Sequence, residues 1–278
     1  SFSYLAAVLL FTETSLGGGI PATTVQRAAT VLCGAWLLAF TLPLLCYCPD
    51  QPARSTSLGL ALRDSLRGVA RGLRDAIGMP AVRHFLVARM LYWDGMMALF
   101  SFVAILAASR LHWHAGELSA FGLLGLLAGS ASGYVGGRLD QRFGSRRMLM
   151  TAIMLMAAIA TAMLILLPDH PEPPLRTGLF SQPGDVPFLL LAVSACGCLG
   201  VIMGSSRSMM VSLSPRDRMG EFFGLYVMVG RASSFAAPLL VATATAVFSD
   251  PIAGIFGVSL AFLLTGLFVL RLVPATHG

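Results

Sequence analysis

The chain has 278 residues, of which 56% are hydrophobic and only 12% are charged, whereas soluble domains carry about 25% charged residues. With a mean hydropathy of +0.78, this composition excludes a soluble enzyme or nucleic-acid-binding domain despite the net charge of +6. At about 20 apolar residues per crossing, the chain has room for seven or eight membrane spans.

Continuous apolar runs predict one partial span and seven complete ones. The partial run, residues 2–11, covers about half the length of a crossing, so we expect it to be the end of a span in a longer protein. The complete runs are residues 28–49, 85–109, 118–137, 148–167, 187–208, 222–248 and 251–270. Barrel strands alternate polar and apolar residues, so these continuous runs predict an all-α polytopic membrane helix bundle.

The linker at residues 50–80 separates residues 1–49 from a predicted six-helix bundle, residues 81–278. Its apolar residues recur at intervals of three and four, at Leu58, Leu62, Leu66, Val69, Leu73 and Ile77. This spacing predicts an amphipathic helix. Two positions for it stay open, on the anionic inner leaflet or against the protein's own cytoplasmic helix ends.

The arginines predict the orientation of the bundle. All 19 basic residues are Arg: thirteen lie on one side, three on the other, and three within or at the edge of spans. Cytoplasmic loops carry the excess of positive charge, so the linker and the loop at residues 138–147 are predicted to be cytoplasmic. The absence of Lys and Asn is typical of a coding sequence rich in G and C, and we expect a multi-pass protein of the cell membrane, the bacterial inner membrane.

A glycine stripe crosses the span at residues 118–137. Gly125, Gly129, Gly133 and Gly137 are spaced by four, so they form one smooth face that lets another helix approach closely. Gly200 and Gly204 form a shorter stripe. The pattern fits either a sliding interface or static tight packing.

The loop after this stripe carries the most specific motif of the chain, residues 137–147, GRLDQRFGSRR. It resembles the loop signature of the major facilitator superfamily, in which a tight turn and its charges latch the cytoplasmic side of two bundles. The resemblance assigns this role to Gly137, Asp140, Arg142, Gly144, Arg146 and Arg147. Gln141 stands where the signature has Asp, and the carboxylate lies one residue earlier. The alternative is that these arginines serve only as a topology anchor.

Further segments narrow the resemblance. These are residues 34–45 (GAWLLAFTLPLL), 85–95 (FLVARMLYWDG), 205–208 (SSRS) and 221–226 (EFFGLY), with Pro238. They are similar to the branch related to the autophagy-associated vacuolar amino-acid effluxers. The resemblance implies that residues 1–49 hold part of helix five and helix six, that residues 81–278 are the complete carboxyl-terminal bundle, and that the solute is an amino acid or similar small molecule moved by efflux.

Ionisable residues within spans are costly and mark candidate sites. Asp94 and Arg231 each follow nine residues after the start of a span, about 14 Å deep at 1.5 Å per residue. We expect them to form a pair, either as a structural salt bridge or as a substrate or proton-coupling site; an aqueous cavity without a defined role is the third possibility. Tyr92 and Trp93 can add an aromatic wall. Arg89, about 140° round the helix from Asp94, is expected to extend toward the inner surface.

A second candidate cluster lies at the cytoplasmic end of the span at residues 187–208. Arg207 is flanked there by Ser205 and Ser208, a combination that can bind an anionic group or can simply anchor the helix. An enzyme is not expected, because an intramembrane aspartyl protease needs a second carboxylate beside Asp94. We also expect no cofactor and no metal, since His112 and His114 have no third ligand.

These observations predict a secondary active transporter that works by alternating access. Its expected partners are a small-molecule solute, membrane lipid and a coupling proton, and nucleic acid is excluded. The alternative function is a non-transporting membrane scaffold or receptor on the same fold.

Overall fold

The computed structural model describes residues 22–47, 58–167, 179–248 and 250–274. The chain divides into two compact units, Ser1–Ala61 and Leu62–Gly278, so the parting lies inside the predicted linker. The first unit contains α2 (Ala22–Tyr47) and the start of α3 (Leu58–Gly78). The predicted partial span at residues 2–11 lies outside the described residues.

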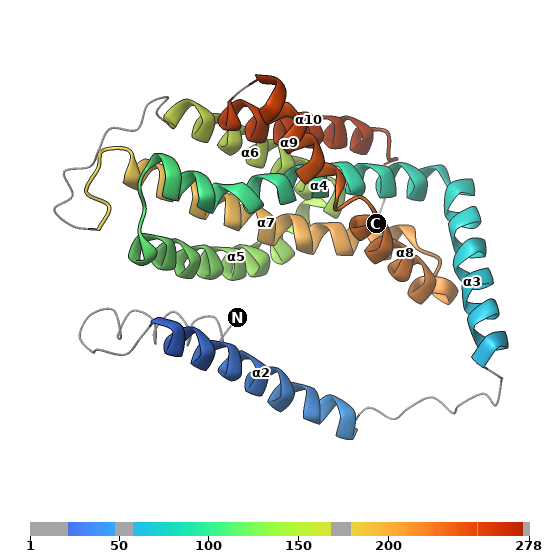
Figure 1. The fold of residues 1–278 in the computed structure, drawn as a ribbon. Helices are drawn as coiled ribbons and strands as arrows, with labels where there is room; N and C mark the ends of the chain where they lie inside the picture. Colours follow the sequence, from blue (N-terminus) through green and yellow to red (C-terminus); the bar gives the residue numbers. More distant parts are fainter. Residues whose placement is uncertain (1–21, 48–57, 168–178, 249, 275–278) are drawn as a thin grey trace. The chain divides into compact units, whose positions relative to one another are not determined.

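The second unit is built from α helices (Figure 1). They are α4 (Pro80–Arg110), α5 (Ala115–Phe143), α6 (Ser145–Leu166), α7 (Asp185–Leu213), α8 (Met219–Ala232), α9 (Ala236–Phe248) and α10 (Pro251–Arg271), with a 3-10 turn, η1 (Arg216–Arg218), before α8. The described residues hold seven segments long and apolar enough to cross a membrane, and the second of them is the whole of α4. These seven correspond to the seven complete spans predicted, which confirms the all-α polytopic bundle.

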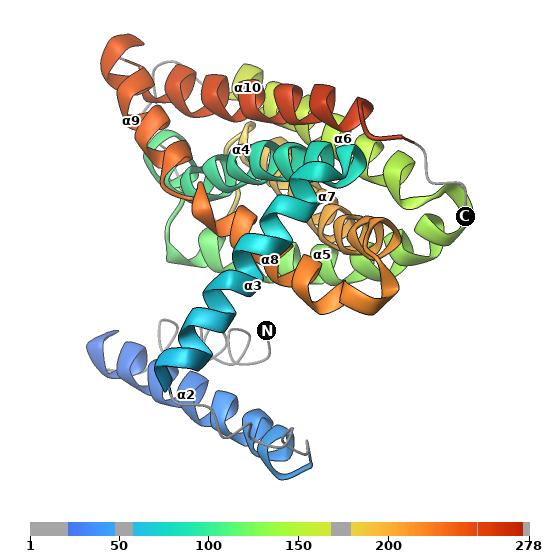
Figure 2. The same cartoon turned by 90° about the vertical axis from the view of Figure 1, so that its right-hand side faces the viewer.

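Two helix pairs form the centre of the second unit. α10 lies along α4, and α5 lies along α7 (Figures 1 and 2). The α4–α10 contact depends on two glycines: a Cβ on Gly95 would lie 2.8 Å from the Ser259 carbonyl oxygen, and one on Gly266 would lie 2.8 Å from the Tyr92 nitrogen. These helices therefore meet backbone to backbone, which leaves the opposite face of α4 for other neighbours.

The predicted span at residues 222–248 is two helices instead of one. α8 ends at Ala232, and the turn that follows has hydrogen bonds from the Ser234 nitrogen to the Arg231 oxygen and from the Ala236 nitrogen to the Ser233 oxygen. Pro238 explains the break, because a proline within a continuous helix has no N–H to donate and clashes with the carbonyl four residues before it.

The end of α3 contacts the bundle. Ala76 is buried, and the Arg218 guanidinium, just before α8, lies 2.7 Å from a carboxylate oxygen of Asp75 and 2.7 Å from one of Glu221. Of the two positions left open for the linker helix, these contacts favour the second for its last turns, which pack against the protein's own helix ends.

Candidate functional site

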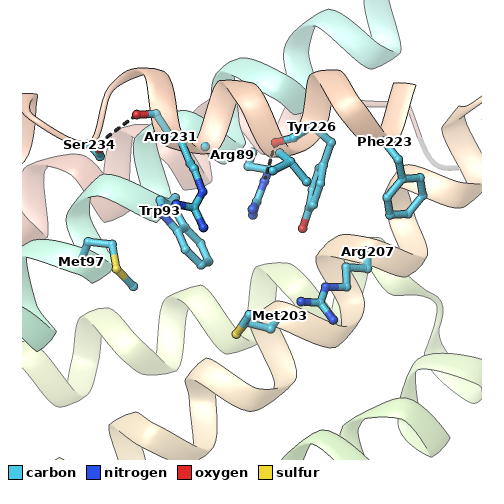
Figure 3. Close-up of a pocket in the computed structure, with 11 residues that line it drawn as sticks. Arg89, Trp93, Met97, Met203, Arg207, Phe223, Tyr226, Arg231 and Ser234 are labelled. Carbon is cyan, nitrogen blue, oxygen red and sulfur yellow. Dashed lines mark hydrogen bonds between the residues drawn. The ribbon is translucent and has the colours of Figure 1, made fainter. Parts of the chain in front are cut away.

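A cavity of about 770 Å³ opens between α4, α7 and α8 (Figure 3). Its volume is within the range of small-molecule sites, about 300–1,000 Å³. The lining consists of three arginines (Arg89, Arg207, Arg231), three aromatic residues (Trp93, Phe223, Tyr226), two methionines (Met97, Met203) and Val227, Gly230 and Ser234. None of these lining residues is acidic.

The helical period explains why these residues face one space. α4 contributes Arg89, Trp93 and Met97, which are spaced by four and so share one face. α7 contributes Met203 and Arg207 at the same spacing. On α8, Phe223, the Tyr226–Val227 pair and the Gly230–Arg231 pair recur at intervals of three to four. Each helix therefore presents a single stripe to the cavity.

Arg89 is the most firmly held of the three arginines. Its side chain is buried, Nη1 donates to the Ser206 Oγ at 3.3 Å, and Nε donates to the Tyr226 carbonyl oxygen at 3.5 Å. The guanidinium carbon lies 3.7 Å from the centre of the Tyr226 ring and 4.7 Å from that of Trp93. A Cβ on Gly230 would lie 3.2 Å from Arg89 Nη2, so the glycine makes room for the charged group.

The expectation that Arg89 extends toward the inner surface is therefore wrong. The side chain finds cation–π and hydrogen-bond partners inside the bundle, which offset the cost of removing it from water. Sequence reasoning missed Arg89 as a site residue. Its spacing of four from Trp93 and of eight from Met97 was the available signal.

Ser206 connects the residues behind the cavity. Its hydroxyl is 2.7 Å from the Tyr92 hydroxyl and 2.9 Å from the Tyr226 hydroxyl. Tyr92, a predicted site residue, is fully buried and lies behind the cavity wall, against Ser206. Ser205, also predicted, is buried and its hydroxyl has no hydrogen-bond partner. The serine that supports the site is thus the neighbour of the one expected.

Arg207 and Arg231 are exposed to the cavity. Figure 3 shows their guanidinium groups extending into the same space from α7 and α8. Within the described part of the chain, neither side chain has an ion pair or a hydrogen bond. α7 continues six residues beyond Arg207, to Leu213, so this arginine is within the helix and not at the end where it was expected.

Asp94 does not pair with Arg231, contrary to expectation. Its side chain is 1% exposed, and neither carboxylate oxygen has a hydrogen-bond partner. Asp94 follows Trp93 directly, so it is turned about 100° away from the face that lines the cavity. The Ser233 hydroxyl approaches the carboxylate without reaching hydrogen-bond geometry. Equal depth along two helices was insufficient, because the two side chains point to different faces.

The motif at residues 137–147, predicted to be cytoplasmic, forms a tight turn between α5 and α6. Gly144 has φ +84°, a conformation that favours glycine. The Asp140 carboxylate accepts a hydrogen bond of 2.8 Å from Ser145, whose hydroxyl is 3.0 Å from that of Ser208 on α7. Ser208, a candidate for the solute site, thus belongs to this turn. Arg146 donates to the Arg271 carbonyl oxygen at 2.8 Å.

The other residues of the motif make fewer contacts. Arg142 and Arg147 are exposed. A Cβ on Gly137 would have no atom within 4 Å, apart from its own helix backbone. The contacts of Asp140 and Arg146 join α5, α6, α7 and the end of α10 at one end of the bundle.

The glycine stripe of α5 faces α7. A Cβ on Gly125 would lie 2.8 Å from the Cys196 sulfur, one on Gly129 3.3 Å from the Cys196 carbonyl oxygen, and one on Gly133 3.9 Å from the Gly200 oxygen. Ser132 adds a hydrogen bond of 2.7 Å to the Gly197 carbonyl oxygen across the interface. α7, which carries Arg207, is therefore held close to α5.

Comparisons with known proteins identify the family of the chain. The profile of a family described as "Vacuole effluxer Atg22 like" matches residues 3–278. The chain is 20% identical over 270 residues to an uncharacterised MFS-type transporter, YxiO, of Bacillus subtilis (strain 168), covering 97% of this chain and 58% of that protein. It is 24% identical over 273 residues to autophagy-related protein 22-1 of Phaeosphaeria nodorum (strain SN15), covering 86% of this chain and 47% of that protein.

The chain thus spans about half the length of these curated relatives. The family match extends over almost the whole chain and includes every helix that lines the cavity. The chain therefore belongs to the Atg22-like vacuole effluxer family, a family of transporters of the major facilitator type.

Proposed function

We propose that the protein is a secondary active transporter, not an enzyme, and that the cavity between α4, α7 and α8 forms part of its solute path. The observation that carries this proposal is the group of three arginines around one cavity inside membrane-spanning helices. Each charged residue at the centre of a span costs about 2.5–3.5 kcal/mol on insertion scales. Such residues are typical of a solute path that contains water.

Two features of the helices around the cavity support alternating access. The break between α8 and α9 lies next to Arg231 and Ser234, and discontinuous helices beside a site are typical of transporters. The close contact of α5 with α7 places small residues where helices can shift against each other. Both features favour a site whose surrounding helices move as rigid bodies during transport.

Asp94 is our candidate for the residue that carries the coupling proton. It is a buried carboxyl group without a hydrogen-bond partner, one residue from Trp93 of the cavity wall. Intramembrane carboxyl groups act as proton relays in pumps and transporters. We expect Asp94→Asn to abolish accumulation driven by a pH gradient and to preserve solute exchange. Asp217→Asn, on the exposed turn before α8, is the matched control.

The solute is proposed to be an amino acid or a molecule of similar size, moved by efflux across the cell membrane. The test is solute counterflow in proteoliposomes that contain the intact transporter, with a panel of labelled amino acids and organic acids. Saturable exchange that is lost when Arg89 is replaced by Gln supports the proposal. A correctly folded protein that exchanges no solute with any gradient would contradict it and favour a scaffold or receptor.

A further inference from the structure

We propose that the cavity selects solutes of net negative charge, an organic anion whose acidic group binds among Arg89, Arg207 and Arg231. This inference rests on the proposed transport function, because it assigns the solute class of the same cavity. It goes beyond a general preference for small solutes or amino acids.

The charge of the lining is the first argument. Three guanidinium groups and no carboxylate line the cavity, and the carboxylate of Asp94 is buried on another face of α4 without a partner. Arg207 and Arg231 have no side-chain partner within the described residues. Unpaired charges at membrane depth are costly, and a bound anion would offset that cost for both arginines at once.

The preorganisation of Arg89 is the second argument. Its Nε and Nη1 are occupied by Tyr226 and Ser206, and its guanidinium carbon lies over the Tyr226 ring. Arg89 also lines the cavity. A guanidinium held in place loses little side-chain entropy when it binds a carboxylate or phosphate oxygen.

The remaining wall indicates what the rest of the solute is. Trp93, Met97, Met203, Phe223 and Val227 present aromatic and apolar surface beside the arginines. An apolar or aromatic body fits this surface, with its acidic head among the guanidinium groups. An ammonium group finds no carboxylate in the lining and is repelled by three positive charges, so basic solutes are disfavoured.

A set of probes that share a phenyl group and differ in head group tests the inference. The probes are 3-phenylpropionate, its neutral amide, the cation 3-phenylpropylamine, and phenyl phosphate, added at equal concentrations to the intact transporter in detergent. We expect one or both anions to raise Tm, with an effect that weakens at high salt. The amide and the amine should leave Tm unchanged. A larger rise in Tm with 3-phenylpropionate than with phenyl phosphate assigns a carboxylate head group to the solute. The reverse order assigns a phosphate head group.

Arginine variants show whether the cavity causes the effect. Arg207→Gln and Arg231→Gln should each weaken apparent anion affinity by about tenfold or more, as expected when a hydrogen bond to a charged group is lost. Arg231→Lys should retain more affinity than Arg231→Gln. Arg74→Gln, which removes an exposed arginine of α3, is the matched control and should bind the anion normally.

Three outcomes overturn the inference: no anion raises Tm, the amide or amine binds as well as the anions, or Arg74→Gln weakens binding as much as Arg231→Gln. Counterflow separates these from failure of the proposed function. A transporter that exchanges neutral or basic solutes keeps its function and loses the anion selectivity. A protein that binds anions and exchanges nothing keeps the site and loses the transport.

Discussion

The Arg89 guanidinium lies over the Tyr226 ring, with 3.7 Å between the guanidinium carbon and the ring centre, and it donates to the carbonyl oxygen of the same tyrosine. The two residues are 137 positions apart, on α4 and α8. Through this contact a charged group of the cavity is held by two helices at once. Any shift of α8 relative to α4 therefore changes where Arg89 presents its charge.

Two replacements of Tyr226 distinguish the contribution of its ring to solute affinity from that of its hydroxyl group. Tyr226→Leu should weaken solute affinity by up to about 30-fold, because a desolvated cation–π contact contributes about 2 kcal/mol. Tyr226→Phe keeps the ring and should change affinity much less. The measurement is KM and kcat for exchange in proteoliposomes. Equal effects of Leu and Phe would show that the ring does not position Arg89.

Ser206→Ala should lower the thermal stability of the protein in detergent. The hydroxyl is shared by Tyr92, Tyr226 and Arg89, and buried polar groups left without a partner cost about 1–3 kcal/mol. Ser212→Ala is the control, since that hydroxyl bonds only to the Met209 carbonyl oxygen of its own helix. A similar loss of Tm in both variants would argue against a shared hydroxyl.

Gly200 and Gly204 lie one turn apart on α7, and their replacement by alanine should affect Tm differently. A Cβ on Gly200 would lie 2.5 Å or less from Ser132 and Gly129 of α5, whereas one on Gly204 has no atom within 4 Å. Overpacking costs about 1–3 kcal/mol, so only Gly200→Ala should lower Tm. If both variants are as stable as the original protein, the α5–α7 interface is looser than the structure shows.

The two glycines of the cytoplasmic motif should also respond differently to alanine. Gly144 has φ +84° and ψ +141°, and a sparsely populated backbone conformation of this kind costs a residue with a side chain about 1–3 kcal/mol. Gly137 lies within α5 with free space around it, where alanine is favoured over glycine by about 0.8–1 kcal/mol. Urea or thermal unfolding in detergent should therefore show a loss for Gly144→Ala and no loss for Gly137→Ala.

Orientation in the membrane can be tested with single cysteines in a background without the native ones. A cysteine at Arg147, in the first turn of α6, should be protected from a charged maleimide added to intact cells. A cysteine at Ser181, which is exposed before α7, should react. Both expected results follow from the orientation predicted by the thirteen-to-three distribution of arginines. Reaction at the Arg147 position in intact cells would reverse the assigned orientation.

The helix bundle was predictable from the sequence because the membrane leaves few choices. A run of about 20 apolar residues must satisfy its backbone hydrogen bonds internally, so it forms a helix wherever it lies in the chain. The seven complete spans followed from this rule alone. The break at residues 233–235 was missed because it contains no charged residue and apolar residues continue on both sides of its two serines, although Pro238 marked the place.

The site was only partly predictable. The depth of each candidate along its helix followed from its position in the chain, but the direction of its side chain did not. Arg231 was found as a charge within a span and Arg207 as one at the end of a span, and both line the cavity. Asp94 was assigned to the same site, but the face it occupies points elsewhere. Arg89 was assigned to the inner surface, yet Tyr226 and Ser206 hold it inside.

The sequence by itself therefore determined which segments of the described chain are long and apolar enough to cross a membrane, since local hydrophobicity and backbone hydrogen bonding act within each segment. The tertiary structure decided which charged groups share one space. That choice depends on the rotation of each helix about its axis, which is set by close contacts such as those of Gly95 with α10 and Gly200 with α5. One residue is about 100° of rotation, so packing alone placed Trp93 in the cavity wall and turned Asp94 away from it.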